Sequence, residues 1–436
     1  MAPSLRSSVT VVALLFVLTL VFLSSVRTSR PATHTASWLL RSTGKLAFVL
    51  RLAEESFDNS AWEIPQYVLD YAPLVYLSDD EDYWPGDISE HFEHVTSYLN
   101  YTPITPDSLP LTMANLNQLN HWSGGKSVYL QSNDDVEKLP DWLTGVDNIP
   151  SREGIASPRA DPLSRAYPPP PTLPPSKQRP RSHDDAHPNS IGYSKAPAIL
   201  VMVPKDDGIV DAFWFFFYSY NLGNMVLGIR FGDHVGDWEH TLVRFQHGKP
   251  THVFVSEHFF GQAYTYDAIE KIGDRPVVYS ATGTHAMYAT PGVHSYILPL
   301  GLLHDNTDRG PIWDPRLNSH RYRYSLTTST LYPEKSSGEG AAAATGWFHF
   351  TGRWGDKMYP PNDPRQYQFA GNSHYVSGPT GPKFKNLARV NVCQDDAKEC
   401  EIRQKLGVLF EDGREERPPV VVPEDVAARE FAYDEL

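Results

Sequence analysis

The chain has little cysteine and no excess of basic charge, and both shortages limit what it can be. Its 436 residues include two cysteines, Cys393 and Cys400, and this C-x6-C pair lacks the partner histidines of the common zinc-binding patterns. The net charge is −14, and no basic stripe appears that would suit nucleic acid as a partner. These shortages exclude the common cysteine-based zinc modules and argue against nucleic-acid binding.

The usual catalytic signatures are missing too. The sequence contains no G-x-S-x-G elbow, no H-E-x-x-H motif, no Walker-type phosphate loop and no dinucleotide fingerprint. Any enzymatic chemistry must therefore come from another arrangement of residues, and no feature of the sequence picks out a substrate.

A hydrophobic run, VTVVALLFVLTLVFL, extends from Val9 to Leu23. At about 15 residues it is shorter than the roughly 20 of a spanning helix, although Ser24 to Val26 extend it. It is long enough for a signal-peptide core, but no clean A-x-A cleavage site follows. Residues 1–30 are therefore predicted to be an uncleaved signal anchor, with a cleaved signal peptide and a secreted protein as the alternative.

The compartment of the body follows from several weak signals. Lys and Arg are denser after the run than before it, which alone favours a cytoplasmic body. Against this stand the sequon at Asn100, the cysteine pair and the ending Tyr433–Leu436, which resembles an ER-retrieval tetrapeptide. Together they predict a single-pass protein of the endomembrane system (ER, Golgi, endosome or vacuole) with a lumenal body and a glycan on Asn100. Cys393 and Cys400 are either free thiols or a disulfide, and an oxidising lumen favours the disulfide.

The rest of the chain divides by composition. Residues 31–64 hold apolar positions at helical spacing, which predicts a short amphipathic juxtamembrane helix or linker. Residues 65–395 are predicted to form the folded domain, interrupted at 151–189 by a Pro-rich insertion that is extended or disordered. Residues 396–436 form an acidic tail.

The folded domain is predicted to be all-β. After residue 196, short apolar runs alternate with Gly, Pro and Asp turns, which is typical of an antiparallel β-sandwich with long loops. Ile209–Tyr220 is rich in aromatic residues and is predicted to be a strand buried on both faces. The full prediction places an N-terminal hydrophobic helix and the short amphipathic helix before this sandwich.

The richest polar stretch is GDHVGDWEH, residues 232–240. In a strand, Asp237 and Glu239 share one face, and His234 precedes them by a turn. His285 follows a glycine in a predicted loop and is the fourth member of the set. Carboxylate and imidazole ligands suit a divalent cation such as Ca²⁺, Mg²⁺, Mn²⁺ or Zn²⁺. From spacing alone, a structural polar network around Trp238 is favoured over a metal site.

Other acidic and histidine residues are also candidate cation ligands. Asp79 to Asp82 form an acidic turn that could gather Ca²⁺, although such runs are more often solvated. His258 and His374 lie in strand and loop contexts where a structural role is favoured over that of a ligand.

Four segments carry a resemblance to a known family. The run His234–His240, the segment Arg275–Ala286, the stretch WFHFTGRWG at Trp347–Gly355, and Gly371–Pro379 are similar to the fungal vacuolar protein sorting-associated protein 62 family. The resemblance spans roughly residues 65–395 and implies a role in delivery between Golgi or endosome and vacuole. It implies no molecular mechanism.

A second, more distant resemblance concerns the same run. It is similar to the G-H-R-H-D-W-E signature of necrosis-inducing toxin-like β-sandwich proteins, in which the signature helps to hold a divalent cation. His234, Asp237 and Glu239 match that signature, whereas Gly236 stands where it has its second histidine. This departure argues against a cytolytic role and leaves cation binding as an implication.

The predicted function is that of a vacuolar sorting protein: a membrane-anchored, lumenal, non-enzymatic binding module for sorting cargo or trafficking proteins, aided by a divalent cation. The alternative is a metal-dependent hydrolase of a glycan or lipid in the secretory pathway. An enzyme needs an open coordination position and a concave pocket beside Asp237, whereas a binding module needs neither.

Overall fold

The computed structural model describes residues 62–152, 190–258, 260–295, 303–338, 340–369, 371–394 and 400–407. The predicted anchor and nearly all of the juxtamembrane segment and of the Pro-rich insertion lie outside these residues, as does most of the C-terminal tail. None of the helices in the described ranges has both the length and the apolar character needed to span a membrane.

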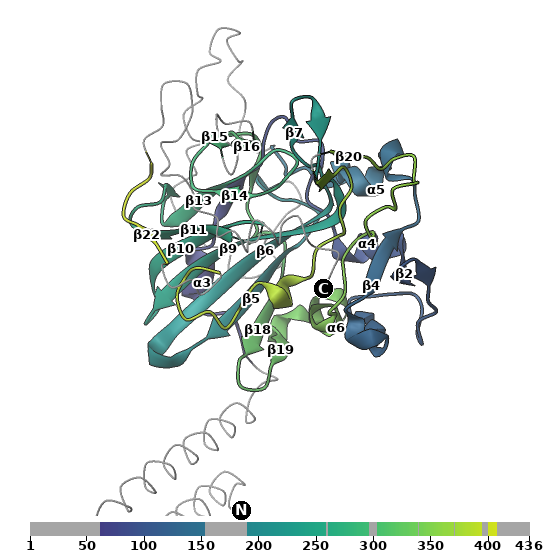
Figure 1. The fold of residues 1–436 in the computed structure, drawn as a ribbon. Helices are drawn as coiled ribbons and strands as arrows, with labels where there is room; N and C mark the ends of the chain where they lie inside the picture. The colour runs from purple at the N-terminus through teal and green to yellow at the C-terminus, as the bar shows by residue number, and fades with distance from the viewer. Residues whose placement is uncertain are drawn as a thin grey trace, which may run out of the picture. The chain divides into compact units, whose positions relative to one another are not determined.

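An eight-stranded sheet forms the centre of the fold (Figure 1). The two longest strands, β6 and β9, pair antiparallel at its middle. In spatial order its strands are β19 (Thr330–Pro333), β18 (Ser319–Ser325), β5 (Ala198–Pro204), β6 (Ile209–Asn221), β9 (His234–Gln246), β10 (Lys249–Glu257), β11 (Phe260–Thr265) and β22 (Ile402–Arg403).

Strand β6 is buried on both faces, as its aromatic sequence predicts. Phe213 and Phe215 belong to the hydrophobic cluster on one side of the sheet, and Trp214 and Phe216 to the cluster on the other side. Successive side chains of a strand point to opposite faces, so a strand that is covered on both sides needs apolar residues throughout.

A five-stranded sheet covers one face of the central sheet. Its residues Val75, Val278 and Trp313 share a buried cluster with Trp214 and Val243 of the central sheet. The predicted β-sandwich is confirmed in this broad sense. The strands of this second sheet are β12 (Lys271–Ile272), β13 (Arg275–Ser280), β1 (Leu74–Tyr76) and β17 (Ile312–Trp313), with β14 (Met287–Tyr288) on β13.

Short helices and a three-stranded sheet cover the other face. Phe92, Leu130 and Trp347 from these elements share a buried cluster with Phe215 and Trp238. The central sheet therefore has a packed layer on each side. The covering elements include α4 (Ile88–Glu93), α6 (Gly346–His349), β2 (Val95–Leu99), β3 (Thr102–Pro103) and β4 (Val128–Ser132).

The predicted antiparallel pairing does not extend to every strand pair of the described residues. β1 pairs parallel with β13, β5 with β18, and β11 with β22. Parallel neighbours need long connections, and each of these pairs joins segments far apart in the sequence. β22 lies in the stretch assigned to the acidic tail, so the folded domain extends past residue 395.

The remaining elements are short. The structure joins Cys393 to Cys400 by a disulfide, with an S–S distance of 1.98 Å. Among the described residues the other α-helices are α3 (Gln66–Asp70) and α5 (Asp141–Thr144), and the other strands form three hairpins: β7 (Met225–Val226) with β8 (Ile229–Arg230), β15 (Gly292–Ser295) with β16 (His304–Thr307), and β20 (Gln368–Phe369) with β21 (Asn372–Ser373).

Candidate functional site

Strand β9 begins with His234–His240, which we call the signature run. This end of β9 lies beside the last residues of β6, just before the loop that connects the two strands. Asp237 lies opposite Tyr218 of β6, and Glu239 lies opposite Phe216. Both carboxylates are buried on the face covered by the five-stranded sheet, while Trp238 points into the cluster on the opposite face. The sequence prediction that Asp237 and Glu239 share one face agrees with this placement.

His285 reaches Asp237 from the loop between β13 and β14. Its Nδ1 lies 3.0 Å from Asp237 Oδ2, and its Nε2 lies 3.0 Å from the carbonyl oxygen of Tyr83. The imidazole ring is fully buried and stacks on Tyr218, with ring centroids 3.7 Å apart. Residue 285 has φ of 57°, a left-handed conformation that histidine tolerates better than most residues.

A third charged group, Glu81, completes the cluster. Glu81 Oε1 lies 3.8 Å from His285 Nε2, and its Oε2 accepts a hydrogen bond from the backbone N–H of Gly283 at 2.9 Å. Its Oε1 also accepts from the N–H of Tyr83 at 2.8 Å. We call Glu81, Asp237 and His285 the buried triad.

The partners of His285 determine its charge. A carbonyl and a carboxylate oxygen only accept hydrogen bonds, so both ring nitrogens of His285 must donate, and the ring is an imidazolium. Burial alone would lower the pKa of His285, but the carboxylates of Glu81 and Asp237 outweigh it and raise the pKa to about 9. Burial would likewise raise the pKa of Asp237, yet the hydrogen bond from His285 holds it below its usual value. The triad is therefore a buried ion-pair network at neutral pH.

Glu239 and His234 have other partners. Glu239 accepts hydrogen bonds from the hydroxyl of Ser256 and from the backbone N–H of His258, and lies 3.4 Å from His258 Nδ1. Burial opposes protonation of His258, but Glu239 outweighs it and raises the pKa to about 10. His234 Nδ1 lies 2.7 Å from the carbonyl oxygen of Gly236.

Of the four predicted ligands, the structure thus brings together Asp237 and His285. Across the described ranges, no group of three or more His, Cys, Asp or Glu residues is arranged to hold a metal ion. An imidazolium has no lone pair to offer a cation, and one oxygen of Asp237 accepts from Trp238 N–H at 2.8 Å while the other accepts from His285. The residues present do not fit a bound cation.

The hydrogen-bond partners of Asp237 and His285 predict how the protein responds to a chelator. EDTA should leave the melting temperature of the wild-type protein and of Asp237→Asn unchanged, because hydrogen bonds from Trp238 and His285 already satisfy the two carboxylate oxygens of Asp237. The measurement is a thermal melt with and without the chelator. A wild-type melting temperature that falls with EDTA, and rises again when one divalent ion is restored, would re-establish the cation.

A metal-independent hydrolase, which differs from the metal-dependent hydrolase predicted as the alternative, would need more than the Asp237–His285 pair. In a hydrolytic triad the carboxylate orients the imidazole, and the outer ring nitrogen faces a nucleophile. Here that nitrogen faces the Tyr83 carbonyl and Glu81. His285 therefore links the β13–β14 loop to β9 through Asp237, and to the acidic turn through Glu81 and the Tyr83 carbonyl.

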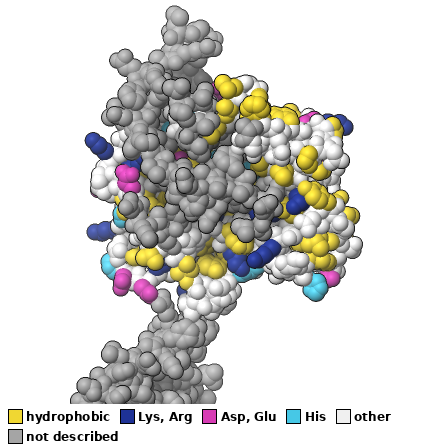
Figure 2. Space-filling model, in the orientation of Figure 1, with side chains coloured by type: hydrophobic (Ala, Val, Ile, Leu, Met, Phe, Trp, Pro, Cys, Tyr) yellow, Lys and Arg dark blue, Asp and Glu magenta, His cyan; other side chains and the backbone are white. Residues whose placement is uncertain are grey.

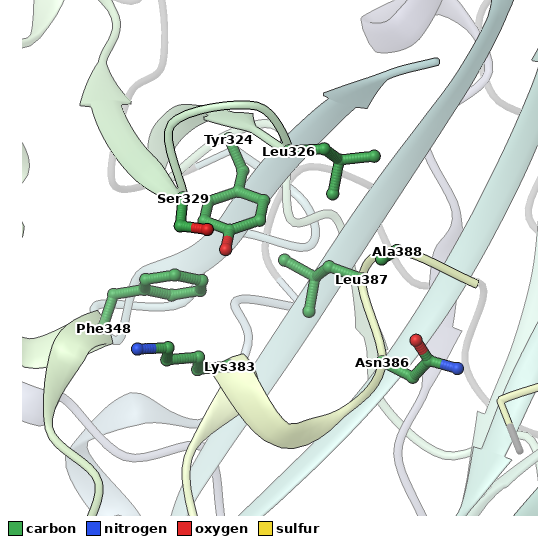
Figure 3. A pocket seen from close by; sticks show the side chains of 8 residues that line it. All are labelled: Tyr324, Leu326, Ser329, Phe348, Lys383, Asn386, Leu387 and Ala388. Carbon is green, nitrogen blue, oxygen red and sulfur yellow. The ribbon is translucent and has the colours of Figure 1, made fainter. Parts of the chain in front are cut away.

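A shallow pocket of about 230 Å³ lies on the other side of the central sheet, away from the triad. Figure 3 shows the rings of Tyr324 and Phe348 with Leu387 around this hollow, and Lys383 beside them. Its lining contains no Asp, Glu or His. It is separate from the signature run, whose carboxylates lie on the opposite face of the central sheet.

The comparisons with known proteins give the family. A family model described as vacuolar protein sorting-associated protein 62 matches residues 215–359. The chain is 37% identical over 363 residues to the putative vacuolar protein sorting-associated protein TDA6 of Saccharomyces cerevisiae, covering 76% of this chain and 68% of the relative. The chain belongs to the vacuolar protein sorting-associated protein 62 family.

A second relative agrees with this assignment. Vacuolar protein sorting-associated protein 62 of Saccharomyces cerevisiae is 35% identical over 389 residues, which cover 79% of this chain and 72% of that protein. Among solved structures, a protein titled "Toxin fold for microbial attack and plant defense" is 12% identical with a TM-score of 0.17, and covers 30% of this chain and 53% of that one. That likeness is too low to support any argument about fold or function.

The family match contains all four predicted ligands and misses one member of the buried triad. His234, Asp237, Glu239 and His285 lie within residues 215–359, whereas Glu81 lies far upstream. The acidic turn was predicted to be solvated, and Asp79, Asp80 and Asp82 are indeed exposed. Glu81 is buried instead, and no sequence pattern distinguishes it from its neighbours.

Proposed function

We propose that the chain acts in vacuolar protein sorting, as a membrane-anchored lumenal binding module whose signature run is structural. The observation that carries the sorting role is its identity of 35–37% with two relatives named for that process, over most of its length. The hydrogen bonds of Asp237, Glu239 and His285 support a binding role over a catalytic one, because each of these groups already has partners within the protein: Asp237 and His285 bond each other, and Glu239 accepts from Ser256.

The sorting role can be tested in Saccharomyces cerevisiae cells that lack both relatives. The full chain should reduce the fraction of a vacuolar reporter protein that is secreted, relative to empty vector. His285→Asn, which breaks the buried triad, serves as the matched negative control. Unchanged secretion, with the wild-type chain present at normal levels on endomembranes, would contradict the sorting role.

The lumenal position predicts two covalent modifications. Asn100 is exposed at the turn between β2 and β3, with Tyr101 and Thr102 of the sequon exposed beside it, which suits an N-linked glycan. A glycosidase should therefore increase gel mobility, and Asn100→Gln should abolish the shift. Alkylation without reductant should label neither Cys393 nor Cys400. An unshifted band together with two reactive thiols would place the body in the cytoplasm.

The anchor predicts the behaviour of the whole chain in a fractionation. Expressed in a eukaryotic secretory system, it should stay with membranes after carbonate extraction, because Val9–Leu23 remains attached. A soluble product that begins near residue 25–30 would indicate a cleaved signal peptide instead.

A further inference from the structure

Two hairpins beyond the paired ends of the central strands β6 and β9 carry exposed hydrophobic side chains. Met225 and Leu227 of the β7–β8 hairpin are 54% and 81% exposed, and Phe369 of the β20–β21 hairpin is 57% exposed. Figure 2 shows hydrophobic side chains on the part of the surface where Figure 1 places β7 and β20. Exposed hydrophobic side chains that gather in one region, unlike single scattered ones, mark a site of interaction.

The two hairpins are held together by hydrogen bonds. The hydroxyl of Tyr367 donates to the carbonyl of Arg230 at 2.8 Å, and Gly232 N–H donates to the carbonyl of Ser373 at 3.2 Å. Phe231 and Tyr367 pack ring to ring, with centroids 6.4 Å apart. The exposed side chains therefore belong to one fixed surface, which we call the hairpin pair.

The hairpin pair has no formal charge at its tips. Residues 222–229 and 366–373 include no Asp, Glu, Lys or Arg, in a chain that is 21% charged with a net charge of −14. The nearest arginines have partners within the protein: Arg230 donates to the Gly223 carbonyl, and Arg365 pairs with Asp363. An acidic protein thus presents a region without formal charge at these two hairpins.

The β7–β8 tip also stands clear of the body. Leu227 and Gly228 both have positive φ, of 52° and 80°, as in a tight two-residue turn. A Cβ built on Gly228 would meet no atom within 4 Å. A stable protein–protein interface buries about 800 Å² on each partner. Two hairpin turns offer a narrower surface than that, so a protein partner fits the hairpin pair less well than a lipid surface does.

We propose that the hairpin pair inserts into the interfacial layer of a lipid bilayer. Leu227, Met225 and Phe369 would enter the boundary of the acyl chains, and Tyr367 would lie at the level of the headgroups, where amphipathic rings are favoured. The lack of charge suits a zwitterionic phosphatidylcholine surface, since an anionic one would repel the acidic body. This contact is additional to the N-terminal anchor and does not depend on the sorting role.

The test uses the full chain with a polarity-sensitive dye on Leu227→Cys, mixed with phosphatidylcholine vesicles that carry nitroxide on their acyl chains. The control is Lys249→Cys, an exposed position that pairs with Gln246 at the opposite end of β9. The two labelled positions lie at opposite ends of a 13-residue strand, about 40 Å apart. Attachment of the chain to the vesicle by its anchor alone is therefore not expected to quench one position and spare the other.

At position 227 the dye should shift to the blue and lose about half of its emission, because the tip lies within about 5–10 Å of the acyl boundary. At position 249 neither change should occur, and adding Phe369→Asp should reduce the quenching at 227. Equal quenching at both positions, or none at 227, would overturn the proposal. A blue shift without vesicles that grows with protein concentration would also overturn it, because the occupant would then be a second copy of this chain.

Discussion

Replacing His285 by asparagine should lower the free energy of unfolding by about 3–5 kcal/mol, the usual cost of removing one partner from a buried ion pair. The variant would leave Asp237 and Glu81 buried without the imidazolium that bonds the first and faces the second. Asparagine is chosen because it tolerates the left-handed backbone at this position, where φ is 57°. The measurement is the urea midpoint of tryptophan fluorescence, compared with His121→Asn at an exposed histidine, which should change stability by less than about 0.5 kcal/mol.

The same residue gives the protein a dependence on alkaline pH. The folded pKa of His285 is about 9, above the unfolded value of about 6.5. Its contribution is therefore complete below about pH 6.5 and is lost as the pH rises through about 9. Wild-type stability should fall over this window, and His285→Asn should fall less, retaining the part due to His258. Parallel pH profiles for the two proteins would show that His285 is neutral in the native state.

Substituting Gly236 by alanine should cost about 2–5 kcal/mol, the sum of left-handed strain and overpacking. Gly236 has φ of 70°, and a Cβ at this position would lie 2.3 Å from the carbonyl oxygen of Trp354. The backbone of the WFHFTGRWG segment would have to move away from β9. The larger Gly236→His, which would supply the second histidine of the toxin signature, should fail to fold.

Gly248 provides the matched control for this prediction. It lies in the turn at the other end of β9 with φ of 76°, but the nearest atom to a built Cβ is a Tyr67 ring carbon at 3.5 Å. Gly248→Ala should therefore cost only the backbone strain, about 1–2 kcal/mol. Equal losses in the two variants would show that the approach of Trp354 contributes nothing.

The structure also explains why a glycine stands at position 236, where the toxin signature has a histidine. The sequence alone showed that a glycine stands at the position of a histidine. The tertiary structure supplies the reason, because a second segment about 120 residues later crosses β9 at that point and leaves no room for a side chain. A conflict of this kind depends on two distant segments, and local sequence patterns do not contain it.

The strands near the signature run, and the sheet face on which each of their side chains lies, could be predicted from local sequence. Alternation along β9 placed Asp237 with Glu239 and Trp238 on the opposite side, and the aromatic run of β6 indicated a strand covered on both faces. These predictions rest on the two-residue period of a strand, which any folded context preserves. The family resemblance was likewise carried by short runs, and the relatives confirm it.

The partners of the signature were decided by tertiary structure. His234, Asp237, Glu239 and His285 looked like one ligand set, because carboxylates and imidazoles suit a cation and sequence spacing cannot reveal a competing donor. Folding instead brought Glu81 to His285 and His258 to Glu239, and the ring nitrogens of His285 became donors. Parallel pairing of β5 with β18 arose in the same way, from segments about 120 residues apart. Local periodicity thus determined which residues are buried on which face, while long-range packing decided which charge each of them meets.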